Sequence, residues 1–300
     1  GSTRRDREAA REAHERAIEA ARAARSVASP VRWGSSRPDA VEIGASMGLI
    51  TYHRWTDPAE ALRHGTALRA RALEAGRPAD VGHIDARLGD LASDAGDTDA
   101  ATMLYDRAIE LATRRHDDLH RAHVTLTRAI ALVRAGREPL DVIPALIARH
   151  REFARATVVA AAELVLGDGL AVSGRWSDAE HAYQRALSLV RVPAAARWRL
   201  LRGERVRGRD TRGELEGVFR ADRDNWWWDR PDVLGFLVEA AATAEQYGQL
   251  DRASRLIAAV VGMRRTFALP TVIAADLAEL EQRYRAEPAR SALPDHLFNR

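Results

Sequence analysis

One stretch of the chain repeats another at a constant offset, and this repeat restricts the possible folds more than any other feature. The segment LGDLASDAGDTDAATMLYDRAIELA begins at Leu88 and aligns with LGDGLAVSGRWSDAEHAYQRALSLV, which begins at Leu166. The residues that recur with an offset of 78 are Leu88/Leu166, Gly89/Gly167, Gly96/Gly174, Ala101/Ala179, Tyr105/Tyr183 and Ala108/Ala186. Self-similarity of this length indicates a fold built from copies of one supersecondary unit.

The pattern inside each copy predicts a pair of helices. Apolar residues follow helical spacing, and Pro and Gly are rare inside the Ala-, Leu-, Arg- and Glu-rich segments. Residues 57–60 (DPAE) and 177–180 (SDAE) carry the capping signals of helix starts. Weaker copies follow at the turn glycines Gly136 and Gly248. We expect about fourteen helices, most of them roughly 12–18 residues long, joined by short turns.

The recurring positions have mechanical reasons. The glycine after the leucine lets the first helix approach its partner closely, and the later glycine ends that helix in a left-handed turn. Such a hairpin cannot bury its apolar face alone and must pack on its neighbours. The predicted fold is therefore all-α, an α-α superhelical solenoid.

The spacing resembles the tetratricopeptide repeat. The copies match its Leu-Gly, turn Gly, Ala, Tyr and Ala positions, with the best repeats at 82–115, 160–191 and 230–265. The usual first-helix Trp and final Pro are missing. The glycine spacings of 40 (96 to 136) and 38 (136 to 174) also exceed the period of about 34 residues that is typical of this repeat. The resemblance implies a superhelix whose first helices line a concave groove.

The segment 228–287 also resembles the C-terminal repeats of large bacterial regulators of the signal-transducing ATPase type. It runs from an Ala-rich helix through a Gly turn to DRASRLIAAVVGMRR, FALP and AADLAELEQRYR. Those regulators join tetratricopeptide repeats to a nucleotide-binding module and often to a LuxR-type or antibiotic-regulator-type DNA-binding domain. The resemblance implies a cytoplasmic sensor or partner-docking arm, with 228–300 as its family-like end. No nucleotide-binding motif or helix-turn-helix accompanies it here, so neither activity is carried over.

We expect one helical-repeat domain over residues 3–300. The opening pair, residues 1–2 (Gly-Ser), is typical of a protease-cleavage remnant. We therefore expect the domains that read DNA or bind nucleotide to lie elsewhere in a longer parent protein. Self-association is a further alternative, because uncapped ends of a helical repeat expose apolar faces.

Composition excludes several kinds of chemistry. All 46 basic residues are Arg, so a lysine-containing phosphate loop and Schiff-base catalysis are impossible. Cys is absent, which removes thiolate nucleophiles and cysteine-ligated zinc. No catalytic motif is present, so we expect no enzymatic activity and no cofactor. No apolar run approaches the ~18 residues of a membrane span.

A polar groove is the leading candidate binding site. Counted along the repeat, the inward positions carry His83, Asp90, Asp94, His123, Arg134 and Asp168. Mixed polar side chains of this kind suit a peptide segment of a protein partner or a small-molecule inducer. Plain solvent exposure of these residues is the alternative.

The tryptophan run DNWWWDRP raises a second question. The rings of Trp226, Trp227 and Trp228 cannot all face one way, because neighbouring residues of an extended segment point to opposite sides. Packing between hairpins is the first interpretation. Contact of an exposed Trp226 or Trp227 with a partner is the second.

An arginine-rich segment is the third candidate. From Arg197 to Arg212 there are seven arginines against two acidic residues. The candidates for anion binding are Arg197, Arg199, Arg202 and Arg205. Nucleic acid is one alternative partner, although the net charge of only +3 argues against it within this fragment. A solvated helix pair whose arginine stems cover apolar surface is the other.

Three histidines have a spacing that could bind a metal. His116, His120 and His123 stand at i, i+4 and i+7. However, Asp117 or Asp118 has the character of a helix N-cap, which would leave His116 in the preceding turn. We therefore expect no metal site.

Overall fold

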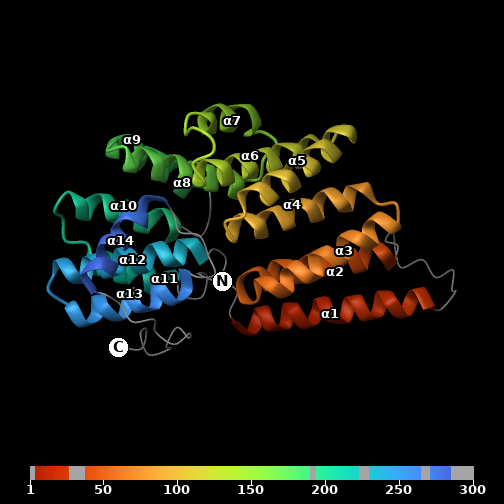
Figure 1. Cartoon of the computed structure of the whole chain (residues 1–300), viewed down its shortest axis with the longest axis horizontal. Coiled ribbons are helices and arrows are strands. Elements are labelled where there is room, and N and C mark those ends of the chain that lie inside the picture. Colours follow the sequence, from red (N-terminus) through yellow and green to blue (C-terminus); the bar gives the residue numbers. More distant parts are fainter. Residues whose placement is uncertain (1–3, 27–37, 190–193, 223–229, 265–270, 285–300) are drawn as a thin grey trace. The chain divides into compact units, whose positions relative to one another are not determined.

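The computed structural model describes residues 4–26, 38–189, 194–222, 230–264 and 271–284, and these residues form helices joined by turns, without strands. The helices are α1 (Arg4–Ser26), α2 (Pro38–Thr56), α3 (Pro58–Glu74), α4 (Pro78–Asp94), α5 (Thr98–Arg114), α6 (Asp118–Arg134), α7 (Val142–His150), α8 (Ala156–Val172), α9 (Trp176–Leu189), α10 (Ala194–Val206), α11 (Arg212–Asp222), α12 (Arg230–Gln246), α13 (Leu250–Arg264) and α14 (Thr271–Tyr284) (Figure 1). The predicted all-α fold of consecutive packed helix pairs, as in an α-α solenoid, is confirmed over this part of the chain.

Contacts between Cα atoms divide the chain into two compact units. Unit 1 consists of residues 1–93 and 97–131, and unit 2 of residues 94–96 and 132–300. The sequence predicts one repeat domain, whereas the packing groups the helices into these two bodies. Among the described helices, none combines the length and the apolar character that crossing a membrane requires.

Unit 1 contains a strict helical register. Helices α3, α4, α5 and α6 are each 17 residues long and begin at residues 58, 78, 98 and 118, a period of 20. Turns of three residues separate them. The residues with positive φ in these turns and in the turn after α6 are Gly76, Gly96, His116 and Gly136. The sequence analysis identified only two of these four positions as turn glycines.

Carboxylates cap the helices that follow these turns. Asp57, Asp97 and Asp117 accept hydrogen bonds of 3.0 Å from the backbone N–H three residues later. Each bond satisfies one of the N–H groups that a helix start leaves unpaired and stabilises the helix by roughly 1 kcal/mol. The chain therefore specifies its helix starts by local chemistry.

The glycine of each Leu-Gly pair lets two helices approach closely, as predicted. A Cβ atom on Gly89 would lie 2.8 Å from the ring of Tyr105 on the next helix, which is too close for two carbon atoms. Gly167 on α8 meets the ring of Tyr183 on α9 in the same way. Both tyrosines are buried. The two hairpins thus share one packing device.

Alternate faces of one helix build the core of unit 1. On α4, Ile84 and Leu88 pack in a cluster with Leu68 of α3 and Ile50 of α2, while Ala86 belongs to a second cluster with α5 and α6. Burial of each large aliphatic side chain contributes about 1.5–3 kcal/mol. Because α4 is covered on both sides, two of its polar residues, Asp85 and Asp90, are also buried.

Unit 2 is built from the hairpins α8–α9, α10–α11 and α12–α13. Helix α10 contacts both α9 and α12, so the three hairpins are linked through it. The last described helix, α14, contacts α12 and α13 and also α8 (Figure 1). That last contact brings together two helices that are six elements apart in the chain.

Candidate functional site

A buried hydrogen bond between aspartate and tyrosine recurs in both hairpins. The Tyr105 hydroxyl donates to Asp90 Oδ1 at 2.9 Å, and the Tyr183 hydroxyl donates to Asp168 Oδ1 at 3.0 Å. Arg199 adds two hydrogen bonds to Asp168, of 2.6 and 3.0 Å. Burial raises the pKa of the Tyr183 hydroxyl above its ordinary value, and the neighbouring Asp168 charge raises it further. The hydroxyl therefore stays protonated and remains a donor.

An ion pair also recurs at the same offset. Arg107 donates to Asp85 at 2.9 Å, and Arg185 donates to Glu163 at 2.9 and 2.8 Å. Asp85 accepts a further bond of 2.6 Å from Arg69. Burial raises the pKa of Asp85, although its bond with Arg69 opposes this effect. Each pair fixes the register of two helices, because a slip would leave a buried carboxylate without its partner.

The predicted groove residues therefore have different surroundings. Asp90 and Asp168 are buried and bonded within their hairpins, while the other four are partly exposed. His83, Asp90 and His123 belong to unit 1, whereas Arg134 and Asp168 belong to unit 2. The two aspartates have a packing role in the structure, and their part in ligand binding stays a prediction.

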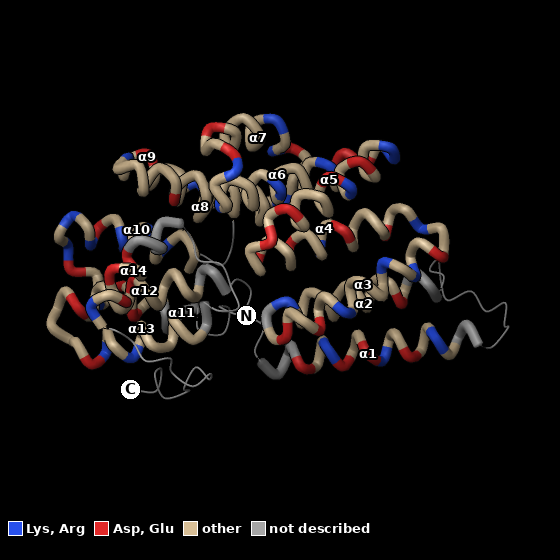
Figure 2. The backbone as a smooth tube through the Cα atoms, in the orientation of Figure 1, with Lys and Arg blue, Asp and Glu red and all other residues tan. Residues whose placement is uncertain are grey.

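The arginine-rich segment is largely ion-paired. The pairs are Arg199 with Asp168, Arg202 with Asp276, Arg205 with Glu239, Arg207 with Glu180, Arg209 with Glu204 and Arg212 with Asp210. Arg197, by contrast, is exposed. Figure 2 shows acidic and basic positions interleaved over the helices of this unit. Acids from other helices thus balance the local excess of arginine that the sequence shows.

The histidines form a pair instead of a metal triad. His116 lies in the turn before α6 with φ 56°, as expected from the Asp117 cap. His120 lies against His83, with 3.9 Å between ring centroids. Burial lowers the pKa of both rings, that of His120 to about 4. Within the described residues, no group of three or more His, Asp or Glu side chains is arranged to hold a metal ion.

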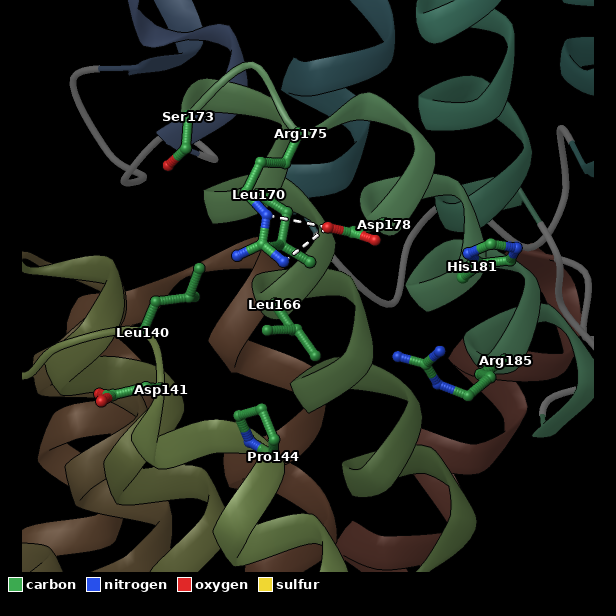
Figure 3. Close-up of a pocket in the computed structure, with 10 residues that line it drawn as sticks. All are labelled: Leu140, Asp141, Pro144, Leu166, Leu170, Ser173, Arg175, Asp178, His181 and Arg185. Carbon is green, nitrogen blue, oxygen red and sulfur yellow. Dashed lines mark hydrogen bonds and ion pairs between the residues drawn. The ribbon is translucent and has the colours of Figure 1, made fainter.

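A pocket of about 590 Å³ lies in unit 2 between α7, α8 and α9. Its lining residues are Leu140, Asp141, Pro144, Leu166, Leu170, Ser173, Arg175, Asp178, His181 and Arg185 (Figure 3). The sequence analysis did not identify this pocket. Its size suits one or two side chains of a bound peptide or a small molecule.

The floor of the pocket is apolar. Leu166 and Leu170 follow each other at i and i+4 on α8, and Leu140 and Pro144 face them from the segment around the start of α7. A Cβ atom on Gly169 would lie 2.6 Å from the side chain of Leu140, so this glycine lets Leu140 rest on α8. The second glycine of LGDG, Gly169, is the sequence signal that could have indicated this contact.

The rim of the pocket is polar and carries both charges, with Arg175, Arg185 and His181 beside Asp141 and Asp178. Arg175 pairs with Asp178 at 2.6 Å, and both side chains are about half exposed. Arg185 donates a hydrogen bond to Glu163 of α8, while His181 is exposed on α9. Exposed pairs of this kind exchange partners at little cost. An apolar floor with two arginines and a histidine above it can hold an apolar side chain beside a carboxylate.

The tryptophan run lies outside the described residues. Neither the packing interpretation nor a contact through Trp226 or Trp227 is therefore addressed by the geometry. Asp90 and Asp168 align at the repeat offset, but the sequence analysis assigned both to a groove and did not predict the buried networks in which they lie. The distant partners, such as Arg199 and Asp276, carry no periodic signal.

Together these observations describe an all-helical protein of packed hairpins with an amphipathic pocket on one unit. A scan of the chain against models of known protein families gives no match, and a search of curated proteins gives none either.

Proposed function

We propose that this chain is a non-enzymatic interaction module of the tetratricopeptide type, which binds a protein partner or small-molecule inducer. In keeping with the sequence resemblance, it would serve as the sensor arm of a bacterial cytoplasmic transcriptional regulator. Binding would favour one curvature of the helix pairs and bias ATPase and DNA-binding domains located elsewhere in the parent protein. The pocket of Figure 3 is the observation that carries the binding part of the proposal.

The lining supports a specific ligand chemistry. Leu166, Leu170 and Pro144 offer dispersion contacts and apolar burial, worth about 25 cal/mol per Å² of apolar surface removed from water. Arg175 and His181 lie above this floor and would meet a carboxylate. We therefore propose that the pocket binds a peptide segment with a leucine-like side chain next to an acidic residue.

A peptide array tests this proposal. Fluorescent decapeptides with one central Leu, flanked by Glu, by Gln or by Arg, are titrated against the whole chain by fluorescence anisotropy. We expect the Glu series to bind best, and the double variant Arg175→Glu/His181→Glu to reduce its affinity at least tenfold. Arg255→Glu on α13 is the matched control, because Arg255 is exposed and lies outside the pocket. Equal binding of the three series, or an unaffected double variant, would show that the proposal is wrong.

The two alternatives have less support. Nucleic-acid binding through the Arg197–Arg212 segment requires free guanidinium groups, and six of its seven arginines pair with acids. A self-association scaffold requires an apolar face that is uncovered at an end of the helical repeat. Gel retardation at low salt tests the first alternative, and light scattering against concentration tests the second.

A further inference from the structure

The inner helices of unit 2 are covered by the chain's own α14. Helices α8, α10 and α12 are the first helices of three successive hairpins. In repeats of this kind the first helices form the concave binding surface. Helix α14 contacts α8 and α12 and reaches α10 through ion pairs (Figure 1). A helix that only extended the series would have no reason to contact α8.

One carboxylate of α14 completes the charge balance of this surface. On α10, Arg199 is paired with Asp168 of α8. Arg205, also on α10, pairs with Glu239 of α12 through two hydrogen bonds, one of them from Nη2 to Oε2 at 3.0 Å. Burial raises the pKa of Glu239, although its bond with Arg205 opposes this effect.

The remaining guanidinium is that of Arg202, whose side chain is only 8% exposed. It donates to Asp276 of α14 at 2.9 Å, and its Nε lies 4.0 Å from the already occupied Glu239. A buried guanidinium that loses its carboxylate is strongly unfavourable. The surface therefore requires one carboxylate from whatever helix covers it.

Two leucines next to this carboxylate provide the apolar contact. Leu277 and Leu280 are each 1% exposed, whereas Glu279 on the other side of the helix is 71% exposed in its side chain. At the rim, Arg283 forms a bidentate bond to Glu245 of α12, at 2.8 and 2.7 Å. Thus α14 presents an acid at position i and leucines at i+1 and i+4.

We infer that the surface formed by α8, α10 and α12 is a docking site for an amphipathic helix of a partner protein, and that α14 is its internal occupant. The partner helix carries a carboxylate in the place of Asp276 and apolar side chains one and four residues later. It binds by displacing α14, so its apparent affinity is reduced by the fraction of molecules in which α14 is in place. The inference rests on the proposed interaction function but concerns a site separate from the pocket of Figure 3.

A peptide with the sequence of residues 271–284 serves as the probe. It is labelled with fluorescein and titrated against the whole chain and two variants. Asp276→Arg places a second cation beside Arg202 and releases α14, so we expect at least tenfold tighter peptide binding than to the wild-type chain. Glu279→Arg is the matched control, because it makes the same charge change on an exposed position of the same helix. A peptide carrying the Asp276→Arg change should bind to none of the three chains.

A cross-link between α14 and α12 tests the inference independently, in case the Asp276→Arg variant fails to fold. The chain has no cysteine, so Glu245→Cys/Arg283→Cys joined by a short bismaleimide fastens α14 to α12 selectively. We expect the cross-link to abolish the peptide binding that the same variant shows before it is joined. Unchanged binding after the joining, or an Asp276→Arg chain that folds and binds no better than Glu279→Arg, would overturn the inference. If the decapeptides still bind at the pocket, the proposed function survives that failure.

Discussion

The α4–α5 hairpin of unit 1 and the α8–α9 hairpin of unit 2 are copies of one motif in different surroundings. Both place a glycine against a tyrosine ring and a tyrosine hydroxyl on a buried aspartate. Asp90 also interacts with Arg54 and Arg87, both at 3.3 Å and partly exposed, whereas Asp168 is held by Arg199, which is 1% exposed. The motif therefore specifies the hairpin, while the neighbouring helices decide how much of its stability depends on buried charge.

Removal of the shared aspartate should separate the two hairpins most strongly. Asp168→Ala removes the carboxylate that neutralises the buried Arg199, and we expect a loss of about 3–5 kcal/mol in the free energy of unfolding. Asp90→Ala removes a carboxylate from Arg54 and Arg87, which are partly exposed and can interact with water instead. We therefore expect a smaller loss of about 1–3 kcal/mol in the free energy of unfolding. Urea unfolding followed by circular dichroism measures both. Glu216→Ala, which removes an exposed pair between α11 and Arg252 of α13, is the control and should change stability by less than about 0.5 kcal/mol. Equal losses from the two aspartate variants would contradict the comparison.

The glycine-tyrosine contact should respond more evenly. A methyl group at Gly89 or at Gly167 would overlap the ring of Tyr105 or Tyr183. We expect Gly→Ala at either position to cost about 1–3 kcal/mol, with Gly167 the more sensitive because its contact is closer. Gly217→Ala inside α11 is the control. No atom lies within 4 Å of a Cβ at that position, so the change should stabilise the helix by roughly 0.5–1 kcal/mol.

Acid should act on a histidine contact between α4 and α6 that the repeat does not reproduce. The His83–His120 contact belongs to unit 1, and the positions 78 residues later are Ala161 and Trp198. Burial lowers the pKa of His120 from 6.5 to about 4, so the unfolded chain binds more protons between these values and stability is lost as pH falls through this range. Allowing for partial exposure, we expect a loss of about 1–2 kcal/mol between pH 7 and pH 5.

The variant His120→Gln isolates this effect. It keeps a polar side chain of similar length but does not titrate, so its stability should fall less between pH 7 and pH 5 than that of the parent chain. Denaturant midpoints at the two pH values provide the comparison. A parent chain and variant with the same pH dependence would show that His120 is protonated equally in the folded and unfolded states.

The hairpins could be predicted from the sequence because their signals are local. Capping aspartates, turn glycines and the Gly–Tyr contact act within one helix pair, and the offset of 78 revealed the turn glycines and the Gly–Tyr pair. The surroundings of Asp90 and Asp168 could not be predicted in this way, since a polar residue on a first helix suits a groove or a buried pair equally well. Arg199 comes 31 residues after Asp168, and no repeated spacing in the sequence indicates that the two residues pair.

The long-range contact of α14 was also beyond the sequence pattern. Whether α14 returns to α8 depends on the accumulated rotation between successive hairpins, which no short motif encodes. The same holds for the pocket of Figure 3, where Leu140 meets α8 because of one extra glycine, Gly169. Local chemistry thus determined the elements, and the contacts between distant elements determined the candidate sites.

The smallest expected effect concerns a turn. In the turns after α3 and α4, Gly76 and Gly96 have positive φ without strain, whereas His116 adopts φ 56° in the turn after α5 and bears a side chain. A left-handed conformation costs a non-glycine residue roughly 1–2 kcal/mol, part of which is offset by the greater freedom of glycine in the unfolded chain. We therefore expect His116→Gly to stabilise the chain by about 0.5–1 kcal/mol in urea unfolding, and Gly96→Ala to destabilise it by about 1 kcal/mol. A neutral or destabilising His116→Gly would show that the imidazole itself holds the α5–α6 turn, and the four turns of this register would then no longer be equivalent.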